Sequence, residues 1–369
     1  MSANVRQPGD RSMNLTRVLT VLFITLSVTA GVYIGRPQTL QPHSKETYLR
    51  NIRQVTFGGE NAEAYFSLDG KRVIFQSTRD PYKCDQIFTM NRDGSNVRLV
   101  STGKGRTTCG YFTPDGNRVI YASTHLGSPD CPPPADRSEG YVWPIYRTFD
   151  IFSAKTDGTD LKRLTTADGY DAEGTVSPDG KKIVFTSTRD GDLDLYDMNL
   201  DGTQQRRLTN ALGYDGGAWH SQDGQWIVWR ASRPGTPAEI DQYKSLFAKN
   251  LVMPSKLEIM VMRADGSDKR QLTKNGAANF APYFHPNGRQ IIFASNVNNP
   301  NPRSPNFDLY LMNRDGSGLQ QVTFDEGFDG FPMFTNDGKY LIWGSNRNAK
   351  TEGETNVFIA EWVDKGSSN

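Results

Sequence analysis

The sequence predicts an all-β fold: a six-bladed β-propeller of four-stranded blades, closed by an N-terminal strand, plus one N-terminal transmembrane helix. Three observations lead to this prediction. A turn signal followed by an apolar run recurs six times, a second turn signal follows in five of the six units, and a strand near the N-terminus matches the one that the last unit lacks. Self-similarity of this kind is the sequence mark of stacked repeat architectures.

Each unit contains an Asp-Gly or Asn-Gly pair, which favours the positive φ angles of a two-residue β-hairpin. The six pairs are Asp69-Gly70, Asp115-Gly116, Asp179-Gly180, Asp223-Gly224, Asn287-Gly288 and Asp337-Gly338. An apolar run such as Val73-Ile74-Phe75 follows each pair. A strand that is apolar on both faces must be covered on both faces, and blades stacked around an axis provide that cover.

A second Asp-Gly pair in five units divides a third strand from an outer fourth strand, so that each unit has strands a to d, counted from the axis outwards. These pairs are Asp93-Gly94, Asp157-Gly158, Asp201-Gly202, Asp265-Gly266 and Asp315-Gly316. The sixth unit ends after its third strand, Val357 to Trp362, and the segment Arg53 to Phe57 resembles the fourth strand of the fifth unit, Gln320 to Phe324. The N-terminal strand is therefore expected to complete the last blade and close the ring.

The repeat resembles that of TolB-like propellers. The segments SPDGKKIVFTSTRDG (Ser177 to Gly191) and LYLMNRDGS (Leu309 to Ser317) carry the resemblance, which recurs in register over residues 50–363. It implies a TolB-like six-bladed β-propeller. The α/β domain that precedes the propeller in TolB is not expected here, which argues against a role in the Tol system.

The N-terminus reads as a separate module. Residues 1–17 carry Arg6, Arg11 and Arg17, residues 18–35 form an uncharged apolar stretch, and residues 36–49 read as a linker before the propeller at 50–363 and a tail at 364–369. The stretch is either a retained transmembrane anchor or a cleaved secretory signal. In both cases the N-terminus is cytoplasmic and the propeller is exported, to the periplasm or another extracytoplasmic space. Because strand d runs from one face of the disc to the other, we expect the tether on the face without long loops.

Composition and cysteines agree with an exported protein. The 42 Lys and Arg residues nearly balance 41 Asp and Glu residues, which argues against a dedicated nucleic-acid binder. Three cysteines, Cys84, Cys109 and Cys131, fit an oxidising compartment, where only two of them can pair. We predict the pair Cys84–Cys109.

Polar residues recur where strand a enters the central channel. In a propeller, the b–c and d–a connections share one face, here the looped face, and the a–b and c–d turns share the other, the plain face. The candidate channel-mouth residues are Asn61, Glu63, Asp171, Glu173, Asp215, Asn279 and Asp329. They either form a polar ring that holds a cation such as calcium or a basic peptide, or cap d–a turns. The second interpretation is favoured.

A second recurring set is basic. Arg79, Arg189, Arg233 and Arg347 lie ten residues after their a–b turns, and strand c opens with Asp150, Asp194, Glu258 or Asp308. We predict that each arginine forms an exposed ion pair with the acid at the start of strand c, which contributes about 0–1 kcal/mol.

Two b–c connections are longer than the others: loop 2, residues 126–148, and loop 4, residues 234–256. In loop 4, apolar residues from Ile240 to Leu251 have helical spacing, which predicts a short amphipathic helix. Aromatic residues of the two loops are candidate anchors for a partner protein, or else the loops pack on each other. These residues are Tyr141, Trp143, Tyr146, Tyr243 and Phe247.

The sequence offers little for catalysis. It has no G-x-S-x-G nucleophile elbow, and its four histidines do not occupy repeated positions. We expect a non-enzymatic, membrane-anchored scaffold that docks, as an accessory subunit, on a larger membrane protein complex in the cell envelope, in transport or in energy transduction, photosynthesis included. The alternatives are a soluble propeller that binds a peptide or polysaccharide, and a polysaccharide lyase that uses the channel carboxylates. No cofactor, nucleic acid or small-molecule substrate is expected.

Overall fold

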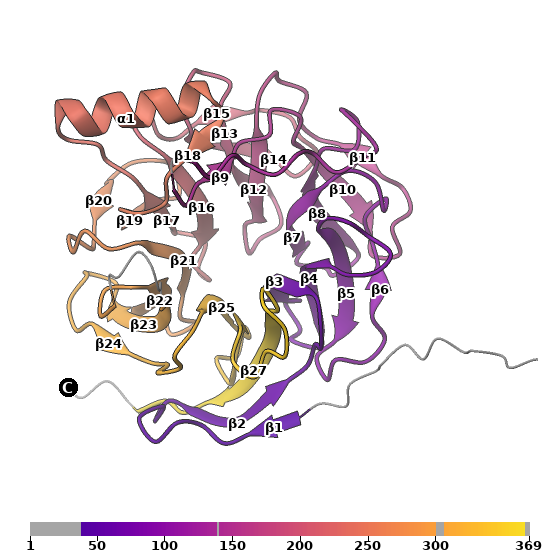
Figure 1. The fold of residues 1–369 in the computed structure, drawn as a ribbon, viewed down its shortest axis with the longest axis vertical. Coiled ribbons are helices and arrows are strands. Elements are labelled where there is room, and N and C mark those ends of the chain that lie inside the picture. Colours follow the sequence, from indigo (N-terminus) through magenta and orange to yellow (C-terminus); the bar gives the residue numbers. More distant parts are fainter. Residues whose placement is uncertain (1–37, 139, 300–305, 366–369) are drawn as a thin grey trace, which may run out of the picture. The chain divides into compact units, whose positions relative to one another are not determined.

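Six sheets are arranged around a central axis (Figure 1) in the computed structural model, which describes residues 38–138, 140–299 and 306–365. Blade 1 contains β3 (Glu60–Phe66), β4 (Arg72–Thr78), β5 (Gln86–Asn91) and β6 (Arg98–Leu99). Blade 2 contains β7 (Thr107–Phe112), β8 (Arg118–Ser123), β10 (Asp150–Lys155) and β11 (Lys162–Arg163). Blade 3 contains β12 (Asp171–Val176), β13 (Lys182–Ser187), β14 (Asp194–Asn199) and β15 (Arg206–Arg207).

The remaining blades follow the same order of antiparallel strands. Blade 4 contains β16 (Asp215–His220), β17 (Trp226–Ala231), β19 (Glu258–Arg263) and β20 (Arg270–Gln271). Blade 5 contains β21 (Asn279–Phe284), β22 (Gln290–Ser295), β23 (Asp308–Asn313) and β24 (Gln320–Gln321). Blade 6 contains β25 (Asp329–Phe334), β26 (Tyr340–Ser345) and β27 (Asn356–Trp362), completed by β2 (Leu49–Gln54) and β1 (Gln38–Leu40). The predicted all-β, six-bladed architecture is confirmed.

The apolar runs form strand b of each blade and are buried on both faces, as expected for stacked sheets. In blade 1 the side chains of Val73, Ile74 and Phe75 are completely inaccessible to solvent. Burial of a side chain of this size contributes about 1.5–3 kcal/mol. The core therefore lies between neighbouring blades.

The turns differ from the predicted two-residue hairpins, because only the glycine of each pair has positive φ, as Gly70 does at 66°. The aspartate instead accepts hydrogen bonds that close a longer turn. The hydroxyl of Ser67 donates to Asp69 Oδ1 at 2.6 Å, and the backbone N–H of Lys71 donates to the same oxygen at 3.1 Å. Asp is therefore a side-chain cap of the turn, and Gly supplies the left-handed residue.

Blade 6 is closed from the N-terminus, but with two strands instead of one. β2 pairs with β27, and β1 pairs with β2 through Gln38↔Gln54 and Leu40↔Ile52. Residues 36–49 were predicted to be a linker, and β1 lies within that range. The Asn348 amide, in the b–c connection of blade 6, donates to Gln38 Oε1 at 3.3 Å. The described chain therefore begins on the looped side of blade 6, not at the plain face as expected, because β1 doubles back along β2.

The predicted n-region and apolar stretch, residues 1–17 and 18–35, lie outside the described residues. Among residues 38–138, 140–299 and 306–365, no helix is long and apolar enough to cross a membrane. The question of anchor or signal is therefore not answered by the described part of the chain.

Candidate functional site

The channel is lined by one bulged residue from each innermost strand. In each blade the pairing of strand a with strand b changes register after the second or third residue of strand a, which marks a β-bulge. The residue at this bulge has φ between 47° and 61°. These six residues are Glu63, Cys109, Glu173, Gly217, Ala281 and Phe331. Positive φ is uncommon for residues other than glycine and marks functional or strongly constrained sites.

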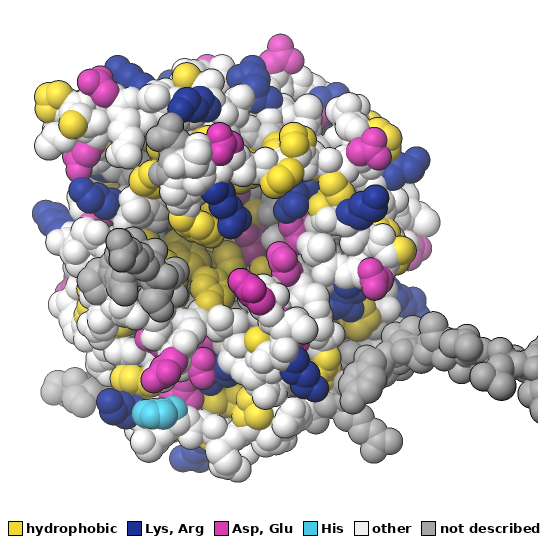
Figure 2. All heavy atoms as spheres, viewed as in Figure 1, with side chains coloured by type: hydrophobic (Ala, Val, Ile, Leu, Met, Phe, Trp, Pro, Cys, Tyr) yellow, Lys and Arg dark blue, Asp and Glu magenta, His cyan; other side chains and the backbone are white. Residues whose placement is uncertain are grey.

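The ring of bulges surrounds a pocket with about 390 Å³ of atom-free space. Glu63, Glu173 and Arg230 supply its charged groups, and Tyr65, Trp219 and Phe331 are among its aromatic lining residues. The looped face is hollowed at its centre, with hydrophobic side chains in the hollow and acidic and basic side chains around it (Figure 2). We call this cavity the looped-end pocket.

Glu173 is the centre of a buried hydrogen-bond network. Its Oε1 accepts from Arg230 Nη2 and from the Tyr214 hydroxyl, both at 2.6 Å. Its Oε2 accepts from the backbone N–H of Gly217 and the Thr186 hydroxyl, both at 2.8 Å. With two donors on each oxygen, the carboxylate is fully compensated and fixed in position.

Arg230 is held across the pocket wall between two rings. Its guanidinium carbon lies 5.2 Å from the Trp143 ring centroid and 5.3 Å from that of Tyr214. A Cβ at Gly217 would lie 1.9 Å from Arg230 Nη1, so the arginine needs glycine at this position. Its Nε is buried without a hydrogen-bond partner among the described residues. Removal of this cation would leave Glu173 as an uncompensated buried charge.

Glu63 differs from Glu173, because it forms no ion pair within the described residues. Burial raises the pKa of its carboxyl to about 7 and outweighs the hydrogen bond from the Cys109 thiol and the attraction of Arg230. The residue is half-buried and lines the looped-end pocket. Its carboxyl is therefore an acceptor in the pocket wall that has no ion-pair partner among the described residues.

The other predicted channel-mouth residues lie inside the blades. Asn61, Asp171, Asp215, Asn279 and Asp329 are at most 1 % exposed. The Asn61 amide donates to the carbonyls of Gly58 and Thr355 at 2.9 and 2.8 Å. This placement favours the structural interpretation for these five residues. Among the described residues, no group of three or more His, Cys, Asp and Glu side chains is arranged to hold a metal ion.

The predicted arginine ion pairs form with different partners. Arginines at the end of strand b bind the acids of strand a: Arg189–Asp171 at 2.9 Å, Arg233–Asp215 at 2.6 Å and Arg347–Asp329 at 2.7 Å. Acids at the start of strand c instead bind arginines of strand d: Arg163–Asp150 at 2.7 Å and Arg207–Asp194 at 2.6 Å. The predicted pairing of strand b arginines with strand c acids was wrong, because arginines of strand d lie nearer to Asp150 and Asp194.

Loops 2 and 4 pack on each other. β9 (Trp143–Pro144) from loop 2 pairs with β18 (Leu251–Val252) from loop 4, and Val142 joins Leu246 and Leu251 in a small buried cluster. Loop 4 contains α1 (Pro237–Ala248), which begins three residues before the predicted helix. Thr236 and Glu239 form a capping box there, a signal that the periodicity argument overlooked.

Four of the five candidate anchors are occupied within this assembly. Trp143 stacks on Arg230, the Tyr146 hydroxyl donates to the Pro133 carbonyl at 2.7 Å, and the Tyr243 hydroxyl bonds to Asp192. The Tyr243 and Phe247 rings stack with centroids 6.0 Å apart. The Tyr141 hydroxyl also accepts a hydrogen bond, from Trp143 Nε1 at 3.1 Å, and the Arg137 guanidinium lies 5.7 Å from its ring centroid, yet 63 % of its surface is exposed. The interpretation of loops that pack on each other therefore accounts for the anchors, and Tyr141 is the one with most surface left to contact a partner.

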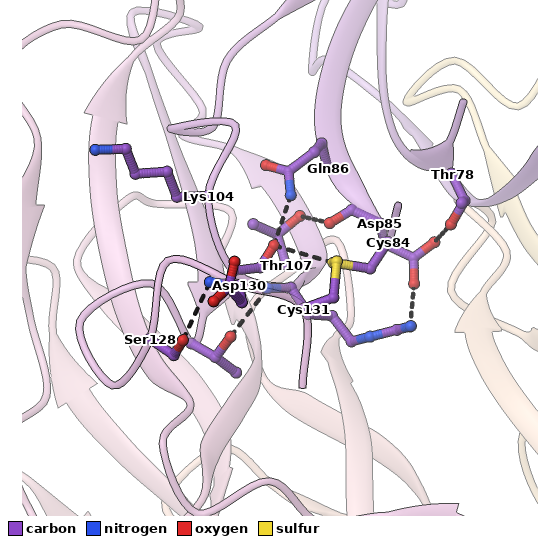
Figure 3. The surroundings of a disulfide bond; sticks show 12 residues. Thr78, Cys84, Asp85, Gln86, Lys104, Thr107, Ser128, Asp130 and Cys131 are labelled. Carbon is purple, nitrogen blue, oxygen red and sulfur yellow. Dashed lines mark hydrogen bonds and ion pairs between the residues drawn. A yellow bond between two sulfur atoms is a disulfide. The ribbon is translucent and has the colours of Figure 1, made fainter. Parts of the chain in front are cut away.

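A disulfide fastens loop 2 to blade 1 (Figure 3), and it joins Cys84 to Cys131. The predicted Cys84–Cys109 pair was wrong: Cys109 is a free thiol. The bulge in β7 turns Cys109 towards the channel, while loop 2 returns over blade 1 and brings Cys131 within 5.9 Å of Cys84, measured between Cα atoms. Burial raises the pKa of the Cys109 thiol well above its ordinary value, so it is a poor nucleophile.

Comparisons with known proteins identify the fold. Residues 148–241 match the family model of the TolB β-propeller domain. A TolB-type structure from Agrobacterium tumefaciens is 19 % identical, with a TM-score of 0.53 over 83 % of this chain and 91 % of that chain. TolB from Acinetobacter baumannii is 17 % identical, with a TM-score of 0.56 over 81 % of this chain and 65 % of that chain.

Propellers with other activities are similar at the same level. An oligogalacturonate lyase from Vibrio parahaemolyticus is 13 % identical, with a TM-score of 0.51 over 88 % of this chain and 96 % of that chain. Identities this low show a shared fold alone. A comparison with curated proteins gave no significant match. The family match over residues 148–241 and the six blades show that this chain contains a six-bladed β-propeller that is similar to the propellers of TolB.

Proposed function

We propose that this protein is a non-enzymatic, extracytoplasmic scaffold that docks on a membrane protein complex through its looped face, held at the membrane by residues 18–35. The looped face carries the proposal, because it presents the Tyr141 side chain, which is 63 % exposed, on a loop that is fixed to the propeller.

The looped face has the rigidity that a docking surface needs. The Cys84–Cys131 disulfide and the β9–β18 pairing fix loop 2 at two points. A preorganised surface binds more tightly because fewer side chains and loops lose freedom on association. A disulfide of this kind also persists in oxidising compartments, which supports an extracytoplasmic location.

Site-specific photo-crosslinking tests the proposal. A photoreactive benzoylphenylalanine at Tyr141 on the looped face should crosslink to integral membrane proteins in native membranes. The same residue at Leu161, which is 37 % exposed in the c–d turn of blade 2 on the plain face, is the matched control. Equal yields at the two positions, or a chain that purifies alone from mild detergent, would contradict docking through the looped face.

A second candidate function follows from Glu63: the looped-end pocket binds a basic segment of a peptide. Glu63 has no cationic partner among the described residues, so a lysine or arginine side chain would supply the missing charge. A lysine-rich peptide should bind Glu63→Gln at least tenfold more weakly than wild type in calorimetry. It should also bind wild type more weakly at pH 5.5 than at pH 8, because the carboxyl is protonated below its pKa of about 7. Equal affinity for the variant would exclude this site.

A further inference from the structure

A second pocket opens at the opposite end of the channel, on the plain face, and we call it the plain-end pocket. It has about 590 Å³ of atom-free space, including the open solvent at its mouth. Its rim contains one residue from each blade, immediately before the a–b turn. These are Leu68, Pro114, Pro178, Gln222, Pro286 and Asn336.

An aromatic plug separates the two pockets. Trp219 lies in the channel, and the rings of Tyr65, Tyr111 and Tyr283 meet it edge-on, with centroids 4.8, 4.9 and 5.1 Å away. Trp219 and Tyr111 contribute to the walls of both pockets. The plug therefore forms the floor of the plain-end pocket and gives it a closed, ring-lined base.

The plain-end pocket contains no charged side chain among its lining residues. Its polar groups are neutral and include Thr113, His220 and the Gln222 amide, which donates to the Asn336 carbonyl at 3.0 Å. Nδ1 of His220 is buried and has no hydrogen-bond partner within the described residues. Burial lowers the pKa of His220 to about 4, so the imidazole is neutral at physiological pH.

A buried polar atom without a partner is uncommon and costs about 1–3 kcal/mol. This atom is closed off from solvent in the structure, so a hydroxyl group in the pocket would satisfy it once the His220 ring turns its Nδ1 towards the pocket. An ion would lose its hydration and find no opposite charge among the lining residues. A planar apolar body would meet prolines and aromatic rings, which provide extensive contact area.

We propose that the plain-end pocket binds a small uncharged ring compound of the phenol type, with its ring among the prolines and aromatic residues and its hydroxyl group beside His220. This ligand site goes beyond the proposed docking function and does not depend on it, because the pocket lies on the face opposite the docking surface.

Binding of phenol to the full-length protein tests the proposal. Ligand-observed NMR and calorimetry should show saturable binding after the signal from empty detergent micelles is subtracted. Benzoate and benzylammonium, which have similar rings but carry a charge, should bind at least tenfold more weakly. Equal affinity for the charged compounds, or no saturable phenol binding, would overturn the proposal.

Two variants locate the site. Leu68→Trp places a large ring at an exposed rim position and should weaken phenol binding at least tenfold, whereas Leu319→Trp should not. The two leucines are similarly exposed, at 42 % and 46 %, and Leu319 does not line the pocket, so the pair separates filling of the pocket from a general effect. His220→Phe should weaken phenol binding but leave toluene binding unchanged. If Leu68→Trp and Leu319→Trp bind phenol equally, the ligand lies elsewhere and the proposal is wrong.

Discussion

The two ends of the channel are built from the same six strands but have opposite chemistry. The looped-end pocket contains Glu63, Glu173 and Arg230, whereas no charged side chain lines the plain-end pocket. The difference follows from backbone geometry, because the bulges occur only near the looped end of each strand a. A bulge redirects one side chain per blade into the channel, so a single irregularity repeated six times creates a site at one end only.

The largest expected effect is the loss of the cation at the looped end. Arg230→Met should lower the free energy of unfolding by about 3–5 kcal/mol, because the Glu173 carboxyl would remain buried without its ion-pair partner. Chemical denaturation of the full-length protein measures this. The double variant Arg230→Met, Glu173→Gln should recover part of the loss. If the single variant is as stable as wild type, the network is not a stabilising feature.

Removal of the disulfide should have the next largest effect and should again act on the looped end. Cys131→Ser should cost about 2–4 kcal/mol, because the bond closes a loop with a sequence separation of 47 residues. Cys109→Ser serves as the control, since that thiol is unpaired. Phenol binding at the plain end should survive the loss of the disulfide. Equal destabilisation by the two serine variants would refute the Cys84–Cys131 assignment.

The two ends should respond to pH in opposite directions. The pKa of Glu63 is raised from its ordinary 4.5 to about 7. Its carboxyl therefore contributes its full stabilisation below pH 4.5, and this contribution is lost as pH rises from 4.5 to 7. The pKa of His220 is lowered from 6.5 to about 4, so stability is lost as pH falls from 6.5 towards 4. Each contribution is about 1–3 kcal/mol.

Single variants separate the two contributions. Glu63→Gln should remove the loss on the alkaline side, and His220→Phe the loss on the acidic side, in denaturation curves recorded from pH 4 to 8. Unchanged pH profiles in both variants would show that other groups control the pH dependence.

The smallest effect on stability is expected for Tyr141, the exposed aromatic residue of loop 2 on the looped face. Tyr141→Ala should change the free energy of unfolding by less than about 0.5 kcal/mol, as is usual for exposed positions, yet reduce recovery of membrane partners severalfold. Co-purification in mild detergent, with Leu161→Ala as the control, measures the difference. A large loss of stability would show that Tyr141 supports loop 2 instead of facing a partner.

The fold could be predicted from the sequence, because each repeated turn and apolar strand fixes local structure and burial together. The site could be predicted only in part. Glu63 and Glu173 were identified as channel residues from their spacing, but the equivalent positions of Cys109 and Phe331 were not, since no sequence pattern predicts a positive φ at those residues. Arg230 was missed because its role depends on Gly217 in the neighbouring strand and on Trp143 in loop 2.

The sequence by itself determined the six blades, the positions of their hairpins, the burial of strand b and the closure of the ring from the N-terminus, because these depend on short-range turn chemistry and on apolar periodicity. The tertiary structure alone decided the partner of Cys84, the partners of the arginines, the pairing of loops 2 and 4 and the side from which the chain enters blade 6. These features depend on contacts between segments far apart in the chain, and their geometry is set only when the blades close around the axis.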